Sequence, residues 1–151
     1  MSNSLTVALD NHAQWSPDGK LIVFDRCRNV CSIWAVDANG THQRRLTPIC
    51  PSDRPPPVCS DDSNPSFAPD GRHIVFVHAS GRIEHQSTSD WVASSEIVWR
   101  DLRRGKLTVL RRLQGFRGDY ETPLVSPDGT KLVSESRTRT AYAQRTPRHC
   151  T

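Results

Sequence analysis

Short apolar-rich segments, separated by polar turn signals, follow one another along the chain. Three of these turn signals are corners of the same composition, Ser/Ala-Pro-Asp-Gly, with apolar residues on both sides. Proline presets φ for the second position of a type I turn, Asp suits the third, and glycine accepts the positive φ that follows. Each corner therefore predicts an antiparallel hairpin. The corner residues are Pro17, Asp18 and Gly19, then Pro69, Asp70 and Gly71, then Pro127, Asp128 and Gly129.

Around each corner the pattern predicts a meander of short strands. The first copy gives a lone strand over 5–9, a linker over 10–12, and strands over 13–15, 21–25, 32–37 and 43–47. Asn39-Gly40 is a two-residue hairpin signal between the last two strands. The second copy gives strands over 65–67, 74–78, 96–101 and 107–110, and the third gives strands over 122–125 and 131–135. No segment has a sustained helical period with caps, so we expect almost no helix.

Four strands in a meander of about 40 residues have the length and pattern of one β-propeller blade. The motif Trp-Ser-Pro-Asp-Gly-Lys-x-Ile-x-Phe, followed by Ile-Trp-x-x-Asp-x-x-Gly and Arg-Arg-Leu-Thr, resembles the WD40-like repeat of TolB-type β-propellers. The resemblance covers about residues 5–135 and implies an all-β fold, an incomplete propeller of about three four-stranded antiparallel blades, two full and the remainder partial. The domain division that follows is a partial propeller over 1–136 and a basic, flexible tail over 137–151.

The predicted blades are too few to close a ring, because a propeller takes 4–8 of them. Three accounts remain open: a fragment of a longer propeller with further blades in cis, two chains that complete a ring of roughly six blades by homo-oligomerisation, or an open stack of sheets. The recurring aromatic residues of the strands are expected in the core in each account. They are Trp15, Phe24, Trp34, Phe67, Phe76 and Trp99.

Composition narrows the classes of function. The chain has 151 residues, 24% of them charged, and its net charge of +4 comes from an Arg-rich end rather than from a clustered face, so nucleic acid is not an expected partner. The longest strictly apolar run, over 21–24, is too short for a membrane span. The first residues lack the pattern of a signal peptide. The resemblance to periplasmic TolB nevertheless implies a periplasmic or extracellular setting.

A meander sorts its connections onto two edges, and the long ones are all expected on the same edge. These are the connector over 48–64 and the loop over 79–95, whereas the connections on the other edge are tight turns. Long loops on one rim of a rigid scaffold are where binding concentrates, although such insertions are also tolerated passively. Aromatic and arginine side chains dominate interface hot spots. The candidate binding residues are Arg54, His85, Trp91, Phe116, Arg117 and Tyr120.

Four cysteines fall on that same rim, and they allow three disulfide connectivities. Cys50 and Cys59 bracket a proline-rich segment, which suits a disulfide, while Cys27 and Cys31 share one loop. Free thiols are the equal alternative, and the spacings do not suit a zinc site. His73, His78 and His85 do not form a ligand set, and the three corner Asp residues belong to separate turns. We therefore expect no metal and no cofactor.

No catalytic motif accompanies this fold prediction. Gly-x-Ser-x-Gly, His-Glu-x-x-His and the glycine-rich phosphate loops are all missing from the sequence. The leading hypothesis is a non-catalytic propeller module that binds a protein or peptide partner through its loop-rich rim. The alternative, also implied by the resemblance, is the gating or substrate-selecting propeller of a prolyl-oligopeptidase-like serine peptidase whose catalytic domain lies outside this chain.

Overall fold

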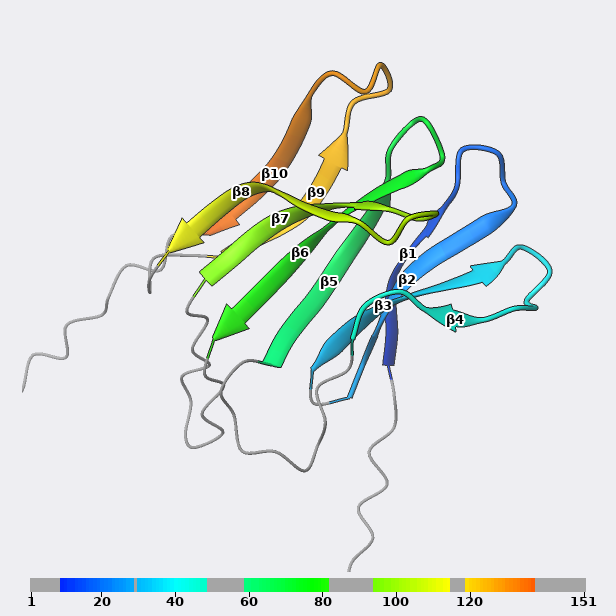
Figure 1. The fold of residues 1–151 in the computed structure, drawn as a ribbon, viewed down its shortest axis with the longest axis horizontal. Helices are drawn as coiled ribbons and strands as arrows, with labels where there is room; N and C mark the ends of the chain where they lie inside the picture. The colour runs from blue at the N-terminus through cyan, green and yellow to red at the C-terminus, as the bar shows by residue number, and fades with distance from the viewer. Residues whose placement is uncertain (1–8, 29, 49–58, 82–93, 115–118, 138–151) are drawn as a thin grey trace, which may run out of the picture.

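Ten antiparallel strands in three sheets make up the part of the chain that the structure, a computed structural model, describes: residues 9–28, 30–48, 59–81, 94–114 and 119–137. The sheets stand side by side like the blades of a fan (Figure 1). The described residues include no helix, and hence none long and apolar enough to cross a membrane. The predicted all-β class and the incomplete propeller are confirmed.

Each sheet follows the chain in simple order, and we call the sheets blades 1, 2 and 3. Blade 1 contains β1 (Leu9–Trp15), β2 (Leu21–Cys27), β3 (Cys31–Asp37) and β4 (Arg44–Arg45). Blade 2 contains β5 (Cys59–Phe67), β6 (His73–Gly81), β7 (Ser94–Asp101) and β8 (Leu107–Gln114). Blade 3 contains β9 (Asp119–Val125) and β10 (Leu132–Arg137).

The three corners form closely similar turns between the first two strands of each blade. In blade 1 the amide of Gly19 donates to the Ser16 carbonyl at 2.9 Å, and Gly19 has a φ of +68°, which an L side chain would strain. The Asp18 carboxylate accepts the Lys20 amide at 3.1 Å. Asp70 and Asp128 accept the equivalent amides at 2.9 and 3.0 Å. The corner Asp residues therefore bind their own turns.

The inner strands are longer than the sequence pattern predicts, because each contains a β-bulge. His12, Asn64 and Thr122 have positive φ values of 49°, 54° and 47°, and each lies three residues before its corner strand ends. The register shifts at each of these points. A bulge lets a strand absorb an extra residue and continue. The predicted linker over 10–12 is therefore part of β1, and β5 begins at Cys59 rather than at residue 65.

The β3–β4 hairpin also differs from its prediction. The amide of Gly40 donates to the Asp37 carbonyl at 2.8 Å, and the amide of Asp37 donates to the Thr41 carbonyl at 3.0 Å. These bonds close a three-residue loop in which Gly40, with φ +83°, forms the bulge after a type I turn. Strand β4 is only two residues long, where five were expected. Beyond it, the Thr47 hydroxyl accepts the Ile33 amide at 2.9 Å in place of a regular ladder bond.

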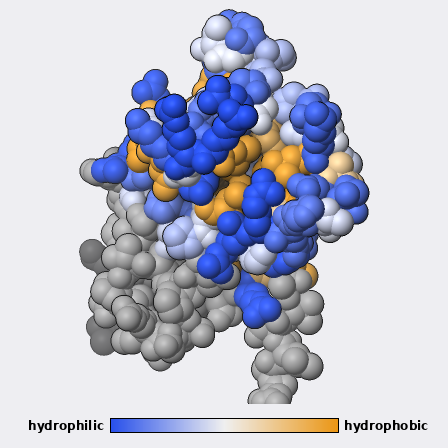
Figure 2. All heavy atoms as spheres, turned by 45° about the vertical axis from the view of Figure 1, so that its right-hand side comes forward, coloured by the Kyte–Doolittle hydropathy of each residue, from blue (hydrophilic) through white to orange (hydrophobic). Residues whose placement is uncertain are grey.

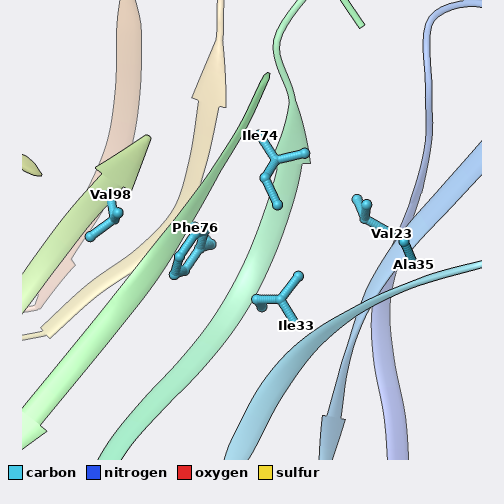
Figure 3. Packing of buried hydrophobic residues seen from close by; sticks show 6 residues of the cluster. All are labelled: Val23, Ile33, Ala35, Ile74, Phe76 and Val98. Carbon is cyan, nitrogen blue, oxygen red and sulfur yellow. The ribbon is translucent and has the colours of Figure 1, made fainter. Parts of the chain in front are cut away.

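The hydrophobic core lies between blades 1 and 2. Six buried side chains from both blades point toward one another there (Figure 3). Leu21, Leu46, Phe67 and Leu102 pack against them. The six are Val23, Ile33, Ala35, Ile74, Phe76 and Val98.

The expectation that Trp15 belongs to the core is wrong, because this side chain is 58% exposed. Phe67, which holds the equivalent place in blade 2, is half-buried because blade 1 packs on that face. No other described sheet packs on the corresponding face of blade 1. Exposure of Trp15 therefore follows from the missing neighbour and not from the strand itself.

Candidate binding edge

Every connection longer than a turn leaves the described sheets from one edge, which we call the loop edge. The strand register shows this directly, since Cys27 pairs with Cys31, Cys59 with Gly81, and Asp119 with Arg137 at the ends of their ladders. The corner turns and the two outer hairpins lie at the opposite end of the strands, the turn edge (Figure 1). The predicted sorting of connections between two edges therefore agrees with the register.

A disulfide joins Cys27 and Cys31 at the loop edge. These residues are cross-strand partners at the ends of β2 and β3, so the bond closes the short loop between the two strands. Of the three connectivities left open by the sequence, those that pair Cys27 or Cys31 with the connector cysteines do not occur. Cys50 lies outside the described residues, as does the side chain of Cys59.

Below the loop edge, a buried carboxylate links the inner strands of blades 1 and 2. Asp25 on β2 is 1% exposed, and its Oδ2 accepts the backbone amide of Asn64 on β5 at 2.9 Å. The same oxygen lies 2.8 Å from Nδ1 of His12 on β1. The other oxygen, Oδ1, is buried and has no hydrogen-bond partner among the residues that the structure describes. Both bulged residues, His12 and Asn64, thus contact one carboxylate.

A second carboxylate crosses the same joint one step nearer the loop edge. Asp61 on β5 accepts the backbone amide of Cys31 at 2.7 Å, so the disulfide-closed hairpin is attached to blade 2. Burial raises the pKa of Asp61 above its usual range, and the nearby charges of Asp62 and Asp25 raise it further, against the lowering effect of the Cys31 amide. Three carboxyl groups therefore converge where the two blades meet.

A row of alternating charges crosses blade 2 at the level of this joint. The register places Asp62, His78, Glu96 and Arg112 opposite one another on the four successive strands. Nδ1 of His78 lies 2.6 Å from Asp62, and Nε of Arg112 lies 2.5 Å from Glu96. The Asp62 hydrogen bond raises the pKa of His78, and the charges of Asp62 and Glu96 add to this against desolvation. We call these four residues the charge row.

Blade 1 holds a paired cation, Arg26, on the face turned away from blade 2. Arg26 donates from Nε and Nη2 to the two oxygens of Asp10 at 2.6 and 2.7 Å, a bidentate pair. Its guanidinium carbon lies 5.3 Å from the ring centre of Phe24 and 4.8 Å from that of Trp34. The hydrogen bond with Arg26 lowers the pKa of Asp10 below its usual value. Arg26 thus covers two aromatic rings while its charge is matched.

The residues predicted from the sequence to bind a partner fall mostly outside the part that the structure describes. Arg54, His85, Trp91, Phe116 and Arg117 lie in the segments between the described ranges. The backbone of Tyr120 pairs with Ser136 in blade 3, but its side chain is outside the described part. The described strands that flank these segments, β5 to β8, have their flanking ends at the loop edge, next to the carboxylates and the charge row.

Sequence reasoning missed the interblade carboxylates and the charge row. Asp25 and Asp62 lie 37 positions apart with a long connector between them, so no local spacing relates them. The two histidines of β6 take separate partners, His73 with Asp70 toward the turn edge and His78 with Asp62 toward the loop edge. Among the described residues, no three His, Cys, Asp or Glu side chains are grouped so that they could hold a metal ion.

Comparison with solved structures establishes the class of fold. A protein assigned as TolB from Agrobacterium tumefaciens aligns with a TM-score of 0.57 and 24% identity, over 87% of this chain and 43% of that one. An oligogalacturonate lyase in complex with manganese aligns with a TM-score of 0.51 and 15% identity, over 81% of this chain and 28% of that one. No family model and no curated protein matches the sequence.

The chain therefore has a TolB-like β-propeller fold, as its corner motif predicted. It spans less than half the length of either structural neighbour. At these identities the likeness concerns the fold alone, because one propeller architecture hosts many activities.

Proposed function

We propose that this chain is a non-catalytic propeller module that binds a protein or peptide partner through its loop edge. The observation that carries the proposal is the register, which collects every long connection of the described blades at one edge. Loops held by a rigid scaffold are the common location of binding residues. The opposite edge offers only tight turns whose polar groups are satisfied by their own backbone.

Rigid support under the loops favours this edge further. The Cys27–Cys31 disulfide, the Asp61 contact with the Cys31 amide and the Asp25 contact with the Asn64 amide all lie immediately beneath it. A recognition surface loses less entropy on binding when its base is already fixed. The charge row adds to this support, because its two ion pairs, His78 with Asp62 and Arg112 with Glu96, link β6 to β5 and β8 to β7 at the same level.

A peptide-display experiment tests the proposal. Random peptides selected on the immobilised chain are expected to protect segments 49–58 and 82–93 from hydrogen–deuterium exchange. The double substitution Trp91→Ala and Arg117→Ala is expected to weaken their binding at least about tenfold. A matched pair at the turn edge, Lys20→Ala and Arg103→Ala, is expected to leave the affinity unchanged. Protection confined to the corner turns would contradict the proposal.

The alternative function, a gating propeller of a serine peptidase, is separated from the first by the parent reading frame. Continuation into a segment with Gly-x-Ser-x-Gly would favour the peptidase. Continuation into further Ser-Pro-Asp-Gly corners only would favour the binding module.

A further inference from the structure

Two sheet faces at the ends of the fan have no described sheet packed against them. The first is the face of blade 1 turned away from blade 2, here called the leading face. The core takes Val23 and Ile33 from blade 1, so strand alternation points Ile22, Phe24 and Trp34 to the opposite, leading side. Arg26 lies over the rings of Phe24 and Trp34 on this side, and Phe24 is only 6% exposed. Trp15 pairs with Ile22 and belongs to the same face.

The second is the face of blade 3 turned away from blade 2, here called the trailing face. Strand β9 packs against β5, β6 and β7, and Pro123 is fully buried in that contact. Leu124 and Val133, which pair with each other, are 44% and 64% exposed. Glu135 is exposed two residues further along β10. Among the described side chains, the trailing face therefore presents the apolar pair Leu124 and Val133, with the charged residues Lys131 and Glu135 two positions before and after Val133.

These faces use the same positions that join blade 1 to blade 2. Counted from the corner of each blade, Val133 and Glu135 stand where Val23 and Asp25 stand in blade 1. Val23 is fully buried in the joint, and Asp25 accepts the Asn64 amide across it. The trailing face thus carries, at Val133 and Glu135, the positions that blade 1 contributes to its joint with blade 2. No described sheet is packed on it.

The leading face carries the positions that blade 2 contributes to that joint. Ile22 and Phe24 stand where Ile74 and Phe76 stand in blade 2, and both of these are buried against blade 1. Figure 2, turned so that the blade 1 side of Figure 1 comes forward, shows apolar atoms exposed among polar side chains. Exposed apolar areas rimmed by polar residues mark interaction sites on proteins.

The equivalence of these positions fits a second copy of this chain as the occupant, because each copy carries both halves of the joint. Two copies together hold six of the described sheets, four of them four-stranded and two of them two-stranded, and six lies within the usual range of blades for closed propellers. A two-fold arrangement supplies one leading face to each trailing face and leaves neither uncovered.

We propose that two copies of this chain close a propeller ring, with the leading face of each packed on the trailing face of the other. Val133 enters the apolar leading face beside Trp15, as Val23 enters the joint between blades 1 and 2. Glu135 accepts the backbone amide of His12 in the second copy. His12 occupies the bulge position that Asn64 occupies in blade 2, where the same amide meets Asp25.

Mass in solution, measured by light scattering on the size-exclusion column, tests the ring. The chain is expected at about 34 kDa, twice its mass of 17.0 kDa. Trp15→Arg spoils only the leading face and Val133→Arg only the trailing face, so each variant alone is expected to be monomeric. Leu107→Arg, at a 49% exposed residue on the outer strand of blade 2, is the matched control and is expected to remain dimeric. Circular dichroism verifies that each variant keeps its β spectrum.

Mixing the two variants gives the sharper test. A mixture of the Trp15→Arg and Val133→Arg chains contains one intact pair of faces, so dimers are expected to reappear in it. A wild-type monomer at the highest soluble concentration would overturn the proposal. So would a dimer that Trp15→Arg disrupts and Val133→Arg leaves intact, which would mean leading-to-leading pairing. Open chains of more than two copies would overturn the proposal as well.

Discussion

The carboxylate of Asp25 on β2 accepts a hydrogen bond from the backbone amide of Asn64 on β5, 2.9 Å away in the next blade. Asn64 has a left-handed φ of 54°, so its amide points out of the ladder where a neighbouring blade can bind it. The same carboxylate contacts His12 on its own blade. One buried charge therefore fixes two bulges and the joint between two blades.

Asp25→Ala is expected to lower the free energy of unfolding by about 3 kcal/mol, because it leaves the Asn64 amide and His12 without their buried partner. Denaturant titration followed by tryptophan fluorescence measures the change. Asp37→Ala is the control, because Asp37 is partly exposed and its pairs with His42 and Arg44 lie at the surface. The control is expected to cost less than about 1 kcal/mol. Equal costs for the two variants would show that Asp25 does not join the blades.

Phe76→Ala is expected to lower the free energy of unfolding by about 3–5 kcal/mol, since the ring is 1% exposed in the core between blades 1 and 2. The same denaturant titration measures it. Leu107→Ala, which truncates a side chain that is 49% exposed, is expected to change stability by less than about 1 kcal/mol. A small effect at Phe76 would mean that the two blades do not share this core.

The third corner predicts a displaced carboxyl titration. Hydrogen bonds from the Ser126 hydroxyl and from the Thr130 amide and hydroxyl lower the pKa of Asp128 to about 2. A lowered folded pKa contributes stability above the unfolded value of 3.8, and this contribution is lost as the pH falls toward about 2.

Ser126→Ala removes the hydrogen bond that lowers the pKa of Asp128 most, so this pKa is expected to rise toward 3.8. A carboxyl-carbon NMR titration measures it. The corner of blade 2 has Ala68 at the equivalent position, so the titration of Asp70 serves as an internal reference. An unchanged Asp128 titration in the variant would contradict the hydrogen bond.

The charge row predicts a pH dependence of opposite sign. The hydrogen bond with Asp62 raises the pKa of His78 above 6.5, so it contributes stability that is complete below 6.5 and is lost as the pH rises through the folded value. Asp62→Asn is expected to lower the pKa of His78, as measured from its ring-proton NMR titration. His12→Gln, which leaves the charge row intact, is the control. A His78 titration unaffected by Asp62→Asn would contradict the pairing.

Local sequence chemistry determined the strands and the corners. Proline, aspartate and glycine at Pro17, Asp18 and Gly19 set a turn whose hydrogen bonds all lie within a few residues, so the motif suffices to predict it. The short apolar runs that contain Phe24 and Phe76, each bounded by turn residues, predicted the strands for the same reason. The class of fold followed because the corner recurs at the spacing of a blade.

Tertiary structure alone decided which faces are covered and which polar residues meet. Trp15 and Phe67 each stand two residues before the proline of their corner, yet only Phe67 packs against the core. Burial of this position depends on a neighbouring blade and not on the strand itself. The contact between Asp25 and Asn64 and the row that joins Asp62 to Arg112 depend on interblade packing and on register across connections of variable length. No spacing along the chain encodes either distance, so these contacts are visible only in the folded protein.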